Sequence, residues 1–117
     1  MLFRSDYDRV LRTMPEWDAA WVNRGIVRAT LGDLLGAIAD YGEAIRRNPN
    51  NHSAYHNRAK AFGALGQVDQ ALEDMGMALA LLPEDAEAMA DRAIFLDRAG
   101  RPWDAERELD GAWKRLR

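Results

Sequence analysis

A 34-residue period dominates the sequence. The segment Ala-Trp-Val-Asn-Arg-Gly that begins at Ala20 returns with substitutions at Ala54 and again at Ala88, each step being 34 residues without an insertion. A fixed period of about 20–50 residues is typical of an array of similar supersecondary units, each of which buries its apolar face against its neighbours. We therefore expect one repeat domain over residues 1–117, with no single central core.

Turn signals divide each period into two helices. Leu31-Gly32, Leu65-Gly66 and Ala99-Gly100 recur in the middle of the periods, and Pro49 and Pro83 recur near their ends. Apolar residues between these turns follow helical spacing, and the short turns favour antiparallel neighbours. The sequence thus predicts an all-α fold of seven helices. The expected helices are 1–14, Glu16–Leu31, Leu34–Arg47, His52–Leu65, Val68–Leu82, Asp85–Ala99 and Pro102–Leu116.

Particular residue types recur at fixed positions of the period. They are Trp21, Gly25, Leu31-Gly32, Ala37, Tyr41, Ala44 and Pro49 in the first full unit, Tyr55, Ala59, Phe62, Gly66, Ala71, Ala78 and Pro83 in the second, and Met89, Ala93, Leu96, Gly100, Ala105 and Ala112 in the third. This pattern resembles the tetratricopeptide repeat (TPR). The resemblance implies a right-handed α-solenoid of antiparallel helix pairs. It would comprise a leading half repeat at 1–17 and full repeats at 18–51, 52–85 and 86–117.

Composition excludes several classes of function. The formal charge is −3 and the pI is near 5.3, so the chain lacks the basic surface that nucleic-acid binding needs. It contains no cysteine, which excludes disulfides and thiolate metal sites. No apolar run is long enough for insertion into a membrane, and the start becomes charged too early for a signal peptide. We expect a cytoplasmic location, or a periplasmic one if the chain is a fragment of a longer protein.

Charged residues recur with the same period. Arg24, Arg58 and Arg92 occupy positions at which the TPR pattern usually has leucine. Because acidic residues recur every 34 residues in the second helices, and arginine suits bidentate pairing with carboxylates, we predict ion pairs between the two sets. The acidic residues are Asp6, Asp40, Asp74 and Glu108.

The TPR resemblance also implies a binding surface. In that family the first helices of the repeats line a concave groove that holds a segment of a partner protein. Asn23, Asn57 and Asp91 share one repeat position, where amide groups can hydrogen-bond a peptide backbone. The acidic third unit favours a basic residue in the ligand, and the alternative for each residue is a solvated helix face. The predicted peptide-binding residues are Val22, Asn23, Ile26, His56, Asn57, Lys60, Glu87, Asp91, Ile94 and Arg98.

Some TPR proteins bind a partner's C-terminal carboxylate through lysine, arginine and asparagine. Val22 and Ile26 occupy two of those positions here, and Glu87 and Asp91 place acid where cations are needed. Asn57 is the one residue that fits. We therefore expect no such carboxylate clamp.

No constellation for catalysis or cofactor binding stands out. His52 and His56 are four residues apart on one helix, but no third metal ligand is expected beside them, and zinc sites use three or four ligands. No glycine-rich phosphate loop follows a strand. The sequence therefore predicts a non-enzymatic protein without a metal or cofactor.

Self-assembly is a second hypothesis of a different class. Solenoids need polar caps at both ends, and apolar residues of the first and last predicted helices have no assigned neighbour. Large exposed apolar patches favour an interface, here a homodimer or a head-to-tail oligomer. Alternatively, Glu106, Arg107, Asp110 and Lys114 cap the last helix, or the chain is cut from a longer solenoid. The apolar residues concerned are Leu2, Phe3, Tyr7, Val10, Leu11, Trp103, Leu109, Trp113 and Leu116.

Overall fold

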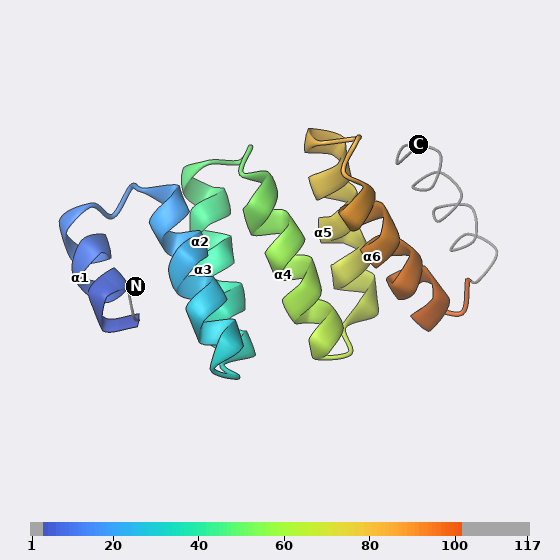
Figure 1. The fold of residues 1–117 in the computed structure, drawn as a ribbon, viewed down its shortest axis with the longest axis horizontal. Helices are drawn as coiled ribbons and strands as arrows, with labels where there is room; N and C mark the ends of the chain where they lie inside the picture. Colours follow the sequence, from blue (N-terminus) through green and yellow to red (C-terminus); the bar gives the residue numbers. More distant parts are fainter. Residues whose placement is uncertain (1–3, 102–117) are drawn as a thin grey trace.

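The computed structural model describes residues 4–101, and this part of the chain is a row of α-helices (Figure 1). No strand occurs within these residues, so the predicted all-α class is confirmed. The seventh expected helix, Pro102–Leu116, lies outside the described residues. The helices are α1 (Arg4–Thr13), α2 (Asp18–Thr30), α3 (Leu34–Arg47), α4 (His52–Ala64), α5 (Val68–Leu81) and α6 (Ala86–Arg98).

The helix boundaries follow the 34-residue frame. The first residues of α2, α4 and α6 are each 34 positions apart, as are those of α3 and α5. Among the described helix ends that can be compared, the largest difference from prediction is at α2, which begins at Asp18, not Glu16. Pro15 and Glu16 form a turn, and Trp17 has an extended backbone (φ −80°, ψ 94°), so Glu16 lies before the first helical turn. At the other ends of these helices, Gly32, Gly66 and Gly100 have φ between 78° and 89°, the left-handed conformation that glycine adopts without a Cβ penalty.

The helices pack in pairs and in layers. α2 packs on α3 and α4 packs on α5, while α1, α3 and α5 each contact the helix that follows them. In addition α2 contacts α4 and α4 contacts α6, whereas no such contact joins α3 and α5. The row of helices therefore curves towards the side formed by α2, α4 and α6, which run side by side in Figure 1. We call this side the inner face.

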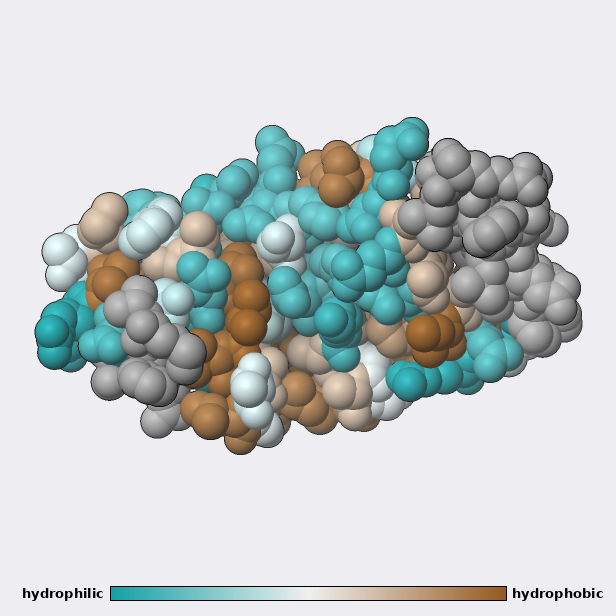
Figure 2. Space-filling view, in the orientation of Figure 1, coloured by the Kyte–Doolittle hydropathy of each residue, from teal (hydrophilic) through white to brown (hydrophobic). Residues whose placement is uncertain are grey.

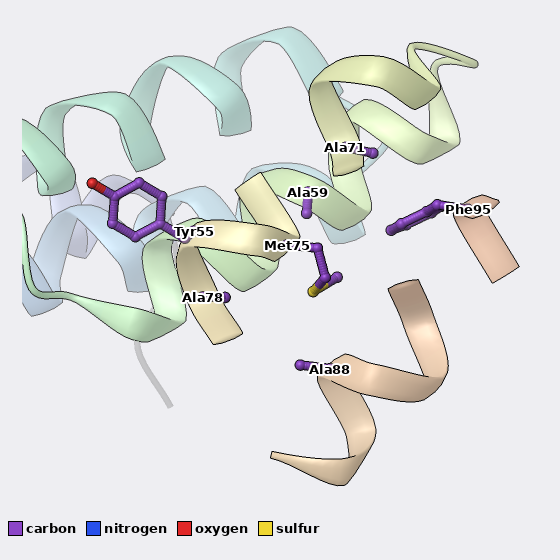
Figure 3. Close-up of a cluster of buried hydrophobic side chains, with 7 residues drawn as sticks. All are labelled: Tyr55, Ala59, Ala71, Met75, Ala78, Ala88 and Phe95. Atoms are coloured by element: carbon purple, nitrogen blue, oxygen red, sulfur yellow. The ribbon is translucent and has the colours of Figure 1, made fainter. Parts of the chain in front are cut away.

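The core consists of small clusters, each shared by adjacent helix pairs. One cluster surrounds Met75, which is fully buried between the α4–α5 pair and α6 (Figure 3). A second surrounds Tyr41 at the junction of α2, α3 and α4. Alanines make up much of both clusters, so helices approach closely and larger side chains fill the remaining space. This is the neighbour-by-neighbour burial that a repeat array requires.

The helix pair α2–α3 is packed most tightly where Gly25 meets Tyr41. A Cβ atom at Gly25 would lie 2.5 Å from Cε1 of Tyr41, closer than carbon atoms can approach. The Tyr41 ring is only 1% exposed, so moving it would disturb the side chains packed around it. One period later the corresponding residues are Ala59 and Met75, both buried in the same cluster. Ala59 on α4 is larger than Gly25, and its partner on α5, Met75, is smaller than Tyr41.

Tyr41 should ionise late in an alkaline titration. Burial, assisted by the charge of Asp40, raises the pKa of Tyr41 to about 12. An unfolded tyrosine ionises near a pKa of about 10, so the native state holds the neutral phenol more strongly. Stability from this difference is fully present below about pH 10 and is lost as the pH rises towards about 12.

Absorbance at 295 nm, with helicity followed by circular dichroism, measures this step. We expect one of the three tyrosines to ionise only as the helices unfold, and Tyr41→Phe to remove that late component. Complete ionisation of all three tyrosines while the helices remain folded would contradict the assignment.

Candidate functional site

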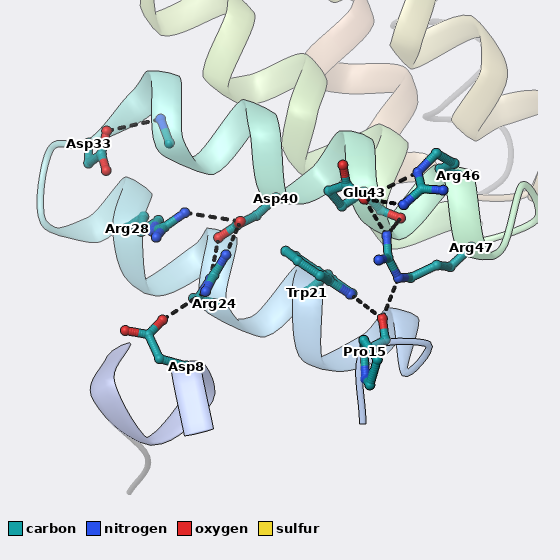
Figure 4. A network of polar contacts seen from close by, with 11 residues as sticks. Asp8, Pro15, Trp21, Arg24, Arg28, Asp33, Asp40, Glu43, Arg46 and Arg47 are labelled. Carbon is teal, nitrogen blue, oxygen red and sulfur yellow. Dashed lines mark hydrogen bonds and ion pairs between the residues drawn. The ribbon is translucent and has the colours of Figure 1, made fainter. Parts of the chain in front are cut away.

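The predicted ion pair of the first full unit lies between α2 and α3 (Figure 4). Arg24 donates from Nε and Nη2 to the two carboxylate oxygens of Asp40, at 3.0 and 2.8 Å. Asp40 is 2% exposed, and it also accepts from Nη1 of Arg28 at 3.0 Å. A third carboxylate contact of Arg24 reaches Asp8 on α1 at 2.8 Å. Hydrogen bonds to Asp40 and then Asp8 raise the pKa of Arg24.

The same pair recurs in the second unit. Arg58 donates from Nε and Nη2 to Asp74 at 2.7 and 2.8 Å, and this bond to Asp74 is the main cause that raises the pKa of Arg58. The prediction is confirmed for these two units. In the third, Arg92 is described but Glu108 lies outside the described residues.

Two members of this network were not predicted. Arg28 follows Arg24 by one helical turn, so an i, i+4 reading of α2 could have placed both guanidinium groups beside Asp40. The residue of α1 that contacts Arg24 is Asp8, whereas the repeat frame pointed to Asp6. Among residues 4–101, α1 packs on α2, and this packing brings Asp8 to Arg24.

A second set of polar contacts holds the turn before α2. Nε1 of Trp21 donates to the carbonyl oxygen of Pro15 at 2.7 Å, and Arg47 from the end of α3 donates to the same oxygen. The guanidinium groups of Arg47 and Arg24 lie 4.5 and 5.0 Å from the Trp21 ring centroid, at cation–π distance. Trp21 therefore fills space, as predicted, and also anchors the turn.

The inner face carries nearly all of the predicted peptide-binding residues. Val22 is the exception, because it is 5% exposed and its side chain belongs to the Tyr41 cluster. The others lie on α2, α4 and α6. Those that are exposed are Asn23, Ile26, Lys60, Glu87, Ile94 and Arg98, and those that are half-buried are His56, Asn57 and Asp91.

A pocket of about 240 Å³ opens on this face between α2 and α4. It brings together three of the predicted residues, Ile26, Asn57 and Lys60, and its remaining lining is largely apolar. The volume suits one large side chain and is below the usual range of small-molecule sites. Figure 2 shows apolar surface over the α2–α3 pair giving way to hydrophilic surface over α4. The other lining residues are Ala29, Thr30, Leu34, Tyr41 and Ala61.

Two inner-face side chains are partly engaged within the protein. Nδ2 of Asn57 donates to the carbonyl oxygen of Ser53 at 2.8 Å, which leaves the side-chain carbonyl and one N–H of Asn57 for a ligand. Nη1 of Arg98 lies 3.5 Å from the carbonyl oxygen of Gly63, which links α6 to α4. The lining of the pocket thus combines apolar side chains with the polar groups of Asn57 and Lys60.

The histidines have carboxylate neighbours that the sequence did not reveal. Nε2 of His52 lies 3.0 Å from Oδ2 of Asp85, and Nε2 of His56 lies 2.9 Å from Oδ2 of Asp91. The expectation that no third ligand accompanies the two histidines was therefore wrong. Asp85 precedes α6, and the contact of α6 with α4 brings it to the start of α4. Asp85 caps α6 as Asn51 caps α4 one period earlier.

Within residues 4–101, no helix combines the length and apolarity that crossing a bilayer requires.

Known proteins resemble this chain in sequence over one segment and in fold over nearly all of it. Residues 25–66 match a family model described as TPR repeat. No curated protein matches the sequence. A solved structure described as "Crystal structure of MamA protein" superposes with a TM-score of 0.90 at 16% identity, covering 96% of this chain and 61% of that one. The structure of MamA 41-end from Desulfovibrio magneticus RS-1 gives 0.89 at 18% identity, covering 97% and 64%.

The chain spans less than two thirds of the length of these two structures. At such identities the likeness shows a common helical-repeat fold.

Proposed function

Because the chain belongs to the tetratricopeptide repeat family, we propose that it is a non-enzymatic scaffold that binds a peptide segment of another protein on its inner face. The proposal takes residues 1–117 as one right-handed domain, with a leading half repeat followed by three full repeats. The observation that carries it is the pocket between α2 and α4, where Ile26, Asn57 and Lys60 meet.

The pocket suggests how a peptide would be held. An apolar side chain of the peptide enters against Ile26 and is desolvated there, which favours binding in proportion to the apolar area removed from water. The Asn57 carbonyl accepts a hydrogen bond from the peptide backbone, and Asn23 is exposed on α2. Further along the inner face, Glu87 and Asp91 favour a basic residue. Affinity should be on the order of micromolar, since a short segment must be ordered on binding.

Selection from a random peptide library, followed by fluorescence anisotropy with the enriched peptides, tests this function. We expect enriched peptides to carry a large apolar residue with a basic residue on one side. Ile26→Asp should weaken binding by at least tenfold, because it places a charge in the apolar pocket, and Asn57→Ala should weaken it less.

Met77→Asp is the matched control. Met77 is 43% exposed on α5, close to the 40% of Ile26, but it lies outside the pocket and should leave affinity unchanged. Peptides that bind Ile26→Asp as tightly as the unaltered protein would refute the inner-face site.

The alternative hypothesis, self-assembly through the terminal helices, depends on Leu2, Phe3 and residues 102–117, which lie outside the described residues. Of its N-terminal residues, Leu11 is buried and Tyr7 and Val10 are half-buried. The peptide-binding proposal is therefore the one that the described residues support.

A further inference from the structure

We propose that His52, His56 and Asp85 form a binding site for a divalent transition-metal ion, with Zn²⁺ as the reference ion. The three side chains converge where the first turn of α4 meets the start of α6. Their candidate ligand atoms all lie within 4.8 Å of one another. This site stands apart from the peptide-binding proposal, although His56 belongs to both.

The separations between the ligand atoms suit coordination. Ligands of a tetrahedral zinc ion at its usual bond lengths are about 3.3 Å apart. Oδ2 of Asp85 is 3.0 Å from Nε2 of His52 and 3.8 Å from Nδ1 of His56. Small rotations of the two imidazoles would place all three atoms on one ion. Two imidazoles and one carboxylate, with a fourth position open to water, form a common zinc ligand set.

Each ligand atom is left available by the contacts around it. Oδ1 of Asp85 accepts the capping hydrogen bond from the backbone N–H of Ala88, which leaves Oδ2 facing the histidines. Nε2 of His56 is paired with Oδ2 of Asp91 at 2.9 Å, so its Nδ1 can present a lone pair. A carboxylate that holds the second ring nitrogen is the usual partner of a metal-bound histidine. Asp91 is therefore a positioning residue.

His52 provides an independent indication. Its Nε2 is buried and has no hydrogen-bond partner among the described residues, although the Asp85 oxygen is only 3.0 Å away. The two atoms therefore approach without hydrogen-bond alignment. A buried nitrogen without a hydrogen bond lowers the stability of the folded state. A cation shared by His52 and Asp85 would give both atoms a partner.

The equivalent place in the preceding unit, where the start of α2 meets the turn before α4, is held by hydrogen bonds. Asp18 occupies the position of His52, and it accepts hydrogen bonds from Nδ2 of Asn48 at 2.9 Å and Nδ2 of Asn51 at 2.8 Å. These bonds, chiefly the one from Asn48, lower the pKa of Asp18. The polar groups around Asp18 are therefore paired by amide–carboxylate hydrogen bonds. At the equivalent place between α4 and α6, Nε2 of His52 has no hydrogen bond among the described residues.

Isothermal titration of the tag-free chain with ZnCl₂ at pH 7.5 tests the proposal. The chain has only two histidines, so imidazole-dependent binding must involve His52 or His56, and dependence on His52 excludes a site formed by His56 with Glu87 and Asp91. We expect one site per chain with a dissociation constant of micromolar or below. Ca²⁺, which prefers oxygen ligands, should not bind measurably. His52→Ala and His56→Ala should each raise the constant by at least tenfold.

Asp85→Asn separates metal binding from folding. Asparagine at the equivalent position, Asn51, already caps α4 by accepting from the backbone N–H of Ala54 at 3.0 Å, so this variant keeps the helix cap and loses the anionic ligand. We expect helicity to be retained while Zn²⁺ affinity falls at least tenfold. Asp91→Asn should weaken binding by about 10- to 100-fold through the orientation of His56. Asp18→Asn at the equivalent place in the preceding unit should leave affinity unchanged.

Two outcomes would overturn the site. One is a dissociation constant for Zn²⁺ above about 100 μM, a range of weak binding. The other is binding that His52→Ala or Asp85→Asn leaves within twofold of the unaltered chain.

Discussion

Replacing Asp40 by alanine is expected to lower the free energy of unfolding by about 3–5 kcal/mol, the cost of removing one partner from a buried ion pair. The carboxylate is 2% exposed and accepts from both Arg24 and Arg28. Neither arginine is more than 22% exposed, so water can replace the lost acceptor only in part. Urea unfolding followed by circular dichroism measures the change.

We attribute the expected loss of stability to the two arginines that Asp40→Ala leaves without their carboxylate partner. A second variant distinguishes this cause from a loss of packing. A variant that combines Asp40→Leu with Arg24→Met and Arg28→Met removes all three charges and should recover most of the stability, since apolar replacements of buried ion groups are often neutral. Arg46→Ala is the surface control. Its side chain is 67% exposed in its pair with Glu43, and the change should cost less than about 1 kcal/mol. A loss below about 1 kcal/mol for Asp40→Ala would refute the argument.

Gly25→Ala should destabilise the protein by about 1–3 kcal/mol, the range for overpacking a core. The direction is informative, because glycine-to-alanine changes inside helices normally stabilise by about 1 kcal/mol. The new methyl group would overlap the ring of Tyr41, which is 1% exposed, so the ring and its packed neighbours would have to shift. Thermal and urea unfolding of the variant give the sign and the size of the effect.

Two comparisons make this prediction specific. Gly76 lies within α5 and a Cβ there would meet nothing within 4 Å, so Gly76→Ala should stabilise by about 0.5–1 kcal/mol. In a Tyr41→Met background, Gly25→Ala should become neutral or stabilising, because the pair then matches Ala59 and Met75. Destabilisation by Gly25→Ala that persists in that background would show that the Tyr41 ring is not the cause.

The 34-residue period was sufficient to predict the helices and the principal ion pairs. Described helix ends agree with prediction to within two residues, apart from the undescribed start of α1, because glycine and proline mark the turns directly. Arg24–Asp40 and Arg58–Asp74 could be predicted because both partners recur in register.

Features that depend on the contact between units were harder to predict. Val22 faces the Tyr41 cluster rather than solvent, and helical spacing alone cannot show whether a neighbouring unit covers such a position. Asp85 reaches His52 only because α6 lies against α4. The fit between Gly25 and Tyr41 depends on the distance between two helix axes, which the residue pattern leaves open.

The pattern of contacts between helices has a mechanical consequence. α4 contacts both α2 and α6 on the inner face, whereas α3 and α5 have no such contact on the outer side. A bend that spreads the outer helices therefore breaks no α3–α5 packing, while a bend that separates the inner helices must break the α2–α4 and α4–α6 contacts. We therefore expect the described part of the chain to bend more easily when the outer helices move apart than when the inner helices do.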